Sequence, residues 1–127
     1  MASASFDEIN VLTTLDSLNE SEIDNLDFGV IGFDPNEIIT VYNAPEANWA
    51  GLKQVDVIGS RIFEIVAPCM NNYLIAERLR CARQEGTSLD YMFEYVLTLR
   101  MRPTPVTLRL LSRQTCATQF ILVRRKQ

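Results

Sequence analysis

Alternation of apolar and polar side chains is most regular in the last third of the chain. Val106, Leu108 and Leu110 alternate with Thr107 and Arg109, and the region is rich in β-branched and aromatic residues. A side-chain period of two is typical of β-strands. The pattern predicts three strands, over residues 89–99, 106–112 and 116–124. Arg102–Pro105 contains two prolines and is predicted as a loop, because proline cannot donate to the ladder of a central strand.

Two shorter apolar runs lie near the start of the chain. Residues 28–33 and 38–42 are rich in β-branched and aromatic side chains. Asp34-Pro35-Asn36-Glu37 between them has the composition of a tight turn. These runs are therefore predicted to form a strand, a turn and a second strand.

The first 25 residues carry two weak helical patterns. Apolar residues recur at helical spacing at Val11, Leu12, Leu15 and Leu18. A second short pattern follows at residues 21–24, and Asn19 or Ser21 is the possible cap that opens it. Isolated helices of this length are marginal in water. We therefore expect residues 1–25 to form a helical cap that docks on the rest of the chain and can detach.

The middle of the chain is predicted to be mainly helical. Its clearest helix runs from about Asn72 to Glu85, with a cap at Asn71 or Asn72 and an end at Gly86. Residues 43–60 are predicted as short helices and connections, with helix ends at Gly51 and Gly59, and residues 61–68 as a short element stopped by Pro68. The whole order predicts one α+β domain: a five-stranded antiparallel sheet with helices on one face, residues 26–127 being its core.

Composition removes many functions. The 127 residues are 47% apolar and 22% charged, as in a single globular domain. The absence of histidine excludes Ser–His–Asp and Cys–His catalysis and histidine-ligated zinc or haem. In a chain without histidine, general acid–base catalysis would depend on carboxylates, so we do not expect an enzyme.

Charge is distributed unevenly along the chain. Residues 1–60 contain eleven acids and one base, a net charge of −10, whereas residues 61–127 contain five acids and eleven bases, a net charge of +6. Either the acidic segment lies against a basic sheet or helix, or the two halves present solvated faces of opposite sign. The total of −4 disfavours nucleic acid as a partner.

The three cysteines, Cys69, Cys81 and Cys116, lack the spacing of a metal knuckle. The acidic start of the chain resembles no signal peptide, and no apolar run is long enough for a membrane span. We therefore expect a cytoplasmic protein with reduced thiols and no membrane partner. Cys81 and Cys116 are interpreted as packing residues.

Three motifs carry a family resemblance. Tyr42-Asn43-Ala44-Pro45-Glu46, Val66-Ala67-Pro68-Cys69 and Met92-Phe93-Glu94-Tyr95 resemble, in order and spacing, the photoactive yellow protein (xanthopsin) family of PAS-fold photoreceptors. The resemblance covers the chain from about Leu12 to its end. It implies a PAS fold and a 4-hydroxycinnamic (p-coumaric) acid chromophore, bound as a thioester to Cys69. Tyr42 and Glu46 would hydrogen-bond its phenolate oxygen. Light-driven trans–cis isomerisation would be followed by proton transfer from Glu46 and by loosening of the N-terminal segment.

The residue chemistry agrees with those roles. A phenol titrates near pH ~10, so an anionic phenolate inside a protein needs strong donors. Glu46 is such a donor if burial raises its pKa. Its neighbours in sequence favour burial because they are mostly apolar: Ala44, Pro45, Ala47, Trp49 and Ala50. Asn48 is the only strongly polar neighbour in sequence. Cys69 precedes a predicted helix start, which favours its thiolate. Without the resemblance, the residues also allow purely structural roles. Cys69 would then be a small buried packing residue, Tyr42 an aromatic residue of the core, and Glu46 an exposed carboxylate on a helix.

Three positions depart from the family pattern. Ala50 stands where the family usually has a hydroxyl residue that bonds the tyrosine, Leu52 where it often has a shielding arginine, and Leu99 where it often has a tyrosine over the pocket mouth. The remaining expected pocket residues, all compatible with a flat aromatic ligand, are Ile31, Phe63, Val66, Ala67 and Met101. We expect the chromophore to be retained, with altered spectrum and recovery rate.

The main alternative is a PAS-type dimerisation or small-ligand sensor module that no longer binds this chromophore. Haem is disfavoured without histidine, and a flavin photoreceptor is disfavoured because no Asn-Cys-Arg-Phe-Leu-Gln run is present. We expect a monomer or weak dimer that signals through a downstream protein, which the sequence does not identify.

Overall fold

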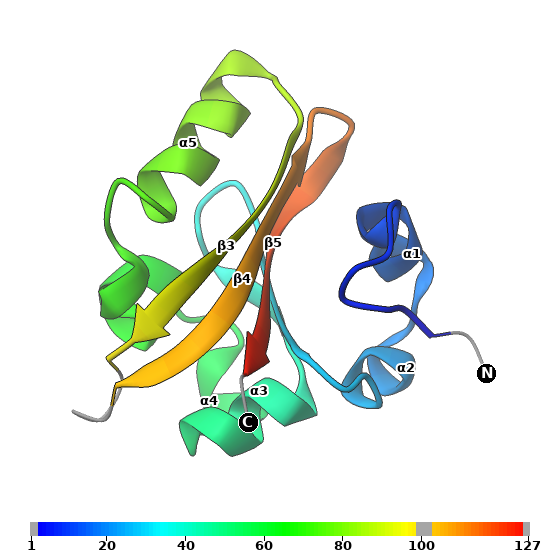
Figure 1. Cartoon of the computed structure of the whole chain (residues 1–127), viewed down its shortest axis with the longest axis vertical. Helices are drawn as coiled ribbons and strands as arrows, with labels where there is room; N and C mark the ends of the chain where they lie inside the picture. Colours follow the sequence, from blue (N-terminus) through cyan, green and yellow to red (C-terminus); the bar gives the residue numbers. More distant parts are fainter. Residues whose placement is uncertain (1–2, 99–102, 126–127) are drawn as a thin grey trace.

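The computed structural model describes residues 3–98 and 103–125 (Figure 1). Five antiparallel strands form one sheet in the order β2-β1-β5-β4-β3, which confirms the predicted fold class. The strands are β1 (Gly29–Phe33), β2 (Ile39–Tyr42), β3 (Leu89–Leu97), β4 (Thr104–Arg113) and β5 (Cys116–Arg125). The central pairing of β1 with β5 brings the first and last strands of the chain side by side.

Helical segments cover both faces of the sheet. Five of them connect β2 to β3: α3 (Ala44–Ala50), α4 (Gln54–Val57), the π-helix η1 (Ile62–Val66), the 3-10 helix η2 (Pro68–Met70) and α5 (Ala76–Glu85). The other two, α1 (Val11–Ser17) and α2 (Glu20–Asp24), precede the sheet and lie on the side opposite α5 (Figure 1).

Strand residues alternate between two hydrophobic clusters because successive side chains point to opposite faces. In β5, Ile121 and Val123 join the cluster beneath η1 and α5, whereas Phe120 and Leu122 join the cluster beneath α1 and α2. β1 is buried along its whole length for the same reason. The second cluster also contains Leu26 and Phe28, so it spans the expected boundary at residue 25, and the division into cap and core stays a prediction.

Polar caps and turns fix the ends of several elements. Asn19 and Glu22 form the capping box of α2. Asp34 Oδ1 accepts hydrogen bonds from the amides of Asn36 and Ile38 and closes the turn between β1 and β2. Gly51 and Gly86 end α3 and α5 in the left-handed conformation, as predicted.

Two predicted boundaries were wrong. The helix expected from Asn72 begins at Ala76, because the Asn72 side chain accepts hydrogen bonds from the amides of Leu74 and Ile75 and closes a separate turn. The predicted loop at Arg102–Pro105 already contributes its last two residues to β4. Pro105 is tolerated there because it lies at the strand end, before the register with β5 starts at Val106. Arg102 lies outside the described residues.

Of the helices in the described part of the chain, none has the length and apolar character needed to cross a bilayer.

Candidate functional site

Asn43 fixes the junction between β2 and α3, the elements that carry Tyr42 and Glu46. Its Oδ1 accepts hydrogen bonds from the amides of Val30 (2.9 Å) and Glu46 (3.3 Å). Its Nδ2 donates to the carbonyl oxygens of Ile23 (3.1 Å) and Phe28 (2.9 Å). Asn43 is therefore the N-cap of α3 and also joins α2 and β1 to this junction.

Glu46 lies in the first turn of α3 and points into the molecule, with 1% of its surface exposed. Its carboxyl group accepts two hydrogen bonds from Arg125 at the end of β5. Nη1 lies 2.8 Å from Oε1 and Nη2 lies 3.1 Å from Oε2. Burial raises the pKa of Glu46, and the hydrogen bonds and charge of Arg125 act in the opposite direction.

Arg125 corrects the expected surroundings of Glu46. The sequence offered only apolar neighbours and Asn48, because Arg125 lies 79 residues further along the chain. Trp49, expected to help bury Glu46, is 66% exposed instead. Its ring packs on the Arg125 guanidinium, with 5.1 Å between the guanidinium carbon and the ring centroid.

Tyr42, the last residue of β2, is buried in the core. Burial raises the pKa of its hydroxyl, the charge of Glu46 raises this pKa further, and the charge of Arg125 lowers it. Tyr42 therefore keeps its proton at neutral pH and is available as a hydrogen-bond donor.

Cys69 is a half-buried free thiol in η2. Its carbonyl oxygen accepts hydrogen bonds from Asn72 Nδ2 (3.1 Å) and the Tyr95 hydroxyl (3.2 Å). Asn72 Nδ2 also donates to the Tyr95 hydroxyl (2.8 Å), so the two side chains form one cluster around the Cys69 backbone. The sequence pattern had flagged Tyr95 only as part of a motif and had given it no role.

The expected activation of Cys69 by a helix start was wrong. The helix α5 begins at Ala76, seven residues later, and η2 has only three residues. A helix dipole acts only within its first turn. Burial raises the pKa of the Cys69 thiol, and hydrogen bonds to the backbone of Thr98 and of Cys69 itself lower it in part.

The three principal predicted residues come from three segments that face the same part of the core. Tyr42 belongs to the hydrophobic cluster beneath η1 and α5, Cys69 packs against that cluster, and the charge of Glu46 raises the pKa of both groups. Ile31, Phe63 and Ala67 are buried in the adjoining core, and Val66 packs against it. Ala50 is buried at the end of α3. Leu99 and Met101 lie outside the described residues.

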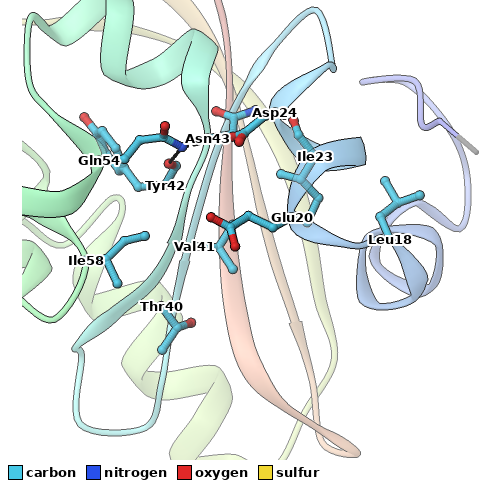
Figure 2. A pocket seen from close by; sticks show the side chains of 10 residues that line it. All are labelled: Leu18, Glu20, Ile23, Asp24, Thr40, Val41, Tyr42, Asn43, Gln54 and Ile58. Atoms are coloured by element: carbon cyan, nitrogen blue, oxygen red, sulfur yellow. Dashed lines mark hydrogen bonds between the residues drawn. The ribbon is translucent and has the colours of Figure 1, made fainter.

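A groove of about 460 Å³ adjoins Tyr42 but belongs to a different part of the molecule (Figure 2). Its walls come from the α2 region, β2 and α4, and neither Cys69 nor Glu46 lines it. Gln54 crosses its upper end, where Nε2 donates to the Tyr42 carbonyl oxygen (2.8 Å) and to Asp24 Oδ1 (2.9 Å). The groove therefore follows the junction between the N-terminal helices and the sheet.

The other two cysteines differ from each other. Cys116 packs against the cluster beneath α1 and α2, as expected. Cys81 is exposed, so the packing interpretation was wrong for it. It lies on the solvent side of α5, away from the buried positions Ile75, Leu79 and Ala82.

Known proteins resemble this chain over nearly its full length. A protein named photoactive yellow protein, from Rhodothalassium salexigens, is 32% identical over 120 residues, which are 94% of this chain and 95% of that protein. The chain belongs to the photoactive yellow protein family. A second family member, from Halochromatium salexigens, is 30% identical over 94% of this chain and 95% of its own. No protein-family model matches the sequence.

Solved structures agree with membership of the photoactive yellow protein family. The photoactive yellow protein domain of the sensor histidine kinase Ppr from Rhodospirillum centenum superposes with a TM-score of 0.81 at 31% identity, over 89% of this chain and 98% of that one. The PAS domain of the quorum-sensing receptor RpfR from Cronobacter turicensis, in complex with BDSF, gives a TM-score of 0.61 at 17% identity, over 80% and 95%. This second likeness concerns the fold alone, which is the PAS fold.

Proposed function

We propose that this chain is a blue-light photoreceptor that carries 4-hydroxycinnamic acid as a thioester on Cys69. The observation that carries the proposal is that the Cys69 thiol and the buried Tyr42 ring pack on the same hydrophobic cluster, while the charge of the buried Glu46 carboxyl group raises the pKa of both. The family membership supports it.

The donor set fits a phenolate-bearing ligand. Keeping a phenol ionised in a protein interior requires hydrogen-bond donors at its oxygen. Tyr42 supplies a hydroxyl that stays protonated, and the raised pKa of Glu46 favours its protonated, donating form. Hydrogen bonds from these two O–H groups to an anionic oxygen are charge-assisted, and such bonds are shorter and stronger than bonds between neutral groups.

Cys69 supplies the attachment point. Its thiolate attacks the acyl carbon of an activated 4-hydroxycinnamoyl ester, the C–S bond forms, and the leaving group departs with the electron pair of its broken bond. The thiol proton passes to solvent. Asn72 and Tyr95 hold the Cys69 carbonyl and thereby fix the backbone on which the thioester is built.

When bound, the chromophore supplies absorption of blue light and a double bond that isomerises. The chain supplies the proton: Glu46 holds it on a carboxyl oxygen at rest and releases it after illumination. An ionised carboxyl group in the interior costs several kcal/mol, a large part of the ~5–15 kcal/mol that stabilises a domain. Asn43 bonds the helix of Glu46 to the Ile23 carbonyl, so we expect the loosening to reach α1 and α2 first.

Reconstitution tests this function. Mixing the purified chain with an activated 4-hydroxycinnamoyl ester is expected to produce visible absorbance and a mass gain located on Cys69. Blue light should bleach the absorbance, and it should recover in the dark. Because burial raises the pKa of Cys69, the rate of attachment should increase with pH.

The other cysteines provide matched controls. Cys69→Ala should remain colourless, whereas Cys81→Ala and Cys116→Ala should colour like the unsubstituted chain. A colourless wild-type protein, or a mass gain on Cys81 alone, would contradict the proposal.

The departures at Ala50 and Leu52 favour one alternative, a PAS-type dimerisation or small-ligand module without this chromophore. Ala50 brings no hydroxyl to the site, and Leu52 is partly exposed. A colourless chain that elutes as a dimer would support this alternative. The downstream partner, the monomeric or weakly dimeric state and the cytoplasmic location stay predictions.

A further inference from the structure

We propose that Arg125 is a positioning residue that receives the ionised Glu46 carboxylate, so that Glu46 alternates between two partners during the light cycle. When protonated, it donates to the phenolate oxygen; when ionised, it accepts from the Arg125 guanidinium. This inference rests on the proposed function and adds to it a residue that holds the product of the proton transfer.

The geometry gives the ionised carboxylate a fitted position. Both carboxylate oxygens face the guanidinium, and the two side chains are 1% and 8% exposed. β1 passes directly beneath the carboxyl group at Gly29, where an added Cβ would overlap Glu46 Oε1. Trp49 stacks on Arg125 from α3. The guanidinium is therefore held in place on more than one side.

Hydrogen-bond chemistry makes this position selective for one protonation state. A guanidinium has donors but no acceptor, so it cannot receive a bond from a carboxyl proton. A proton on either oxygen of Glu46 would also replace one of the two charge-assisted bonds. The pair with Arg125 is thus strongest for ionised Glu46, and the bond to a phenolate exists only for neutral Glu46.

The other charged and titratable groups around Glu46 do not take this role. Tyr42 from β2 and Cys69 from η2 are neutral when protonated, and β1 offers Gly29. Arg124 pairs with Asp7. Asp27 lines the same small pocket as Arg125 but has the charge sign that would repel the carboxylate.

The chromophore-free protein gives a first test. Carboxyl ¹³C NMR is used to titrate Glu46 in the wild type and in Arg125→Gln, and the pKa is expected to rise by about one unit or more in the variant. Arg125→Lys should restore much of the difference because it keeps the charge. Arg124→Gln, the matched control on the neighbouring arginine, should leave the pKa of Glu46 unchanged. Equal pKa values in the wild type and Arg125→Gln would overturn the inference.

A measurement on the wild type covers the case in which Arg125→Gln does not fold. The ¹⁵N chemical shifts of the Arg125 guanidinium should change with pH at the same midpoint as the ionisation of the Glu46 carboxyl group. Glu46→Gln should abolish this change. Separate midpoints would overturn the inference.

The reconstituted protein gives a second test. Loss of the Arg125 pair should speed dark recovery up to about tenfold for each unit by which the pKa rises, because one unit is a factor of ten in proton affinity. In Glu46→Gln, the further change Arg125→Gln should have no such effect. A chain that stays colourless would contradict the proposed function, but the chromophore-free titrations would still test the role of Arg125. A chain that becomes coloured, but in which the pKa of Glu46 is the same with and without Arg125, would contradict only this inference.

Discussion

Gly29 allows the carboxyl group of Glu46 to lie directly against β1. An added Cβ would overlap Oε1 and would lie 3.1 Å from Cδ and 3.2 Å from Cβ of Glu46. Because these atoms belong to one short side chain on a packed helix, the overlap is relieved only if Glu46 turns away. Because Gly29 has no side chain, the buried ion pair of Glu46 and Arg125 has room beside β1.

Gly29→Ala is therefore expected to separate Glu46 from Arg125 and to lower the free energy of unfolding by roughly 1–3 kcal/mol, the usual effect of overpacking a core. Urea unfolding measures the loss, and the ¹³C titration of Glu46 measures the separation. Gly32→Ala is the matched control in the same strand. Its Cβ would meet Val41 and Phe120 at 3.0 Å, so it should destabilise the fold without changing the titration of Glu46. If Glu46 titrates in Gly29→Ala with the same midpoint as in the wild type, Gly29 is not needed for the pairing of Glu46 with Arg125.

At the scale of elements, Arg109 joins the N-terminal segment to the sheet. The side chain leaves β4 with 5% exposure, and its Nη1 donates to the carbonyl oxygens of Phe6 (2.7 Å) and Glu8 (2.8 Å). Its Nε and Nη2 hold both carboxylate oxygens of Asp90 on β3, each at 2.7 Å. The segment before α1 is thus fixed by a buried, charge-assisted contact.

Arg109→Met should release this segment, because two carbonyl oxygens lose their donors while the apolar contacts of the cluster beneath α1 and α2 remain. Hydrogen exchange of the α1 amides should become about tenfold faster or more, with α5 unchanged. Asp90→Asn, which keeps Arg109 and its bonds to the cap, should have the smaller effect. Uniform acceleration in α1 and α5 would show that Arg109 stabilises the whole domain instead.

Elements whose pattern depends on near neighbours were predictable, and those decided by side-chain contacts were not. The strands near residues 29–33 and 116–125 followed from their β-branched and aromatic content. The start of α5 did not, because the Asn72 side chain competes for the amides that a helix would use. In the candidate site, Tyr42, Glu46 and Cys69 were predicted from local motifs, and their roles stay predictions. Arg125 was missed because only the β1–β5 pairing brings it near Glu46.

At the scale of the whole molecule, ion pairs connect the acidic first half of the chain with the basic second half. Among residues 3–98 and 103–125, three of them join these halves: Arg80 with Glu37, Arg124 with Asp7 and Arg125 with Glu46. Arg124 and Arg109 also bind the N-terminal segment, so part of the acidic segment does lie against a basic sheet. The charge asymmetry therefore contributes to how the chain is held together.

The pair between Glu37 and Arg80 predicts a pH dependence of stability. The hydrogen bond from Arg80 lowers the pKa of Glu37 in the folded chain. The unfolded chain then binds the proton more tightly, so the contribution is complete above the ordinary pKa of about 4.3 and is lost as pH falls through the lowered value. Both side chains are partly exposed, so we expect a small effect, about 1 kcal/mol or less.

Glu37→Gln should unfold more readily than the wild type at pH 7, and the difference should shrink towards zero in strong acid. Thermal unfolding from pH 7 to pH 2 measures it. Glu64→Gln, which removes an exposed carboxylate, is the control and should show little difference at any pH. A difference that stays constant over this range would mean that Glu37 acts through packing rather than charge.

Trp49 gives this protein an internal optical probe. It is the sole tryptophan of the sequence, and its indole ring rests on the guanidinium that holds Glu46. All tryptophan fluorescence therefore originates beside that ion pair, and the emission requires no attached dye. Changes in intensity or wavelength would follow the parting of Arg125 from Glu46 in real time, on the unmodified chain.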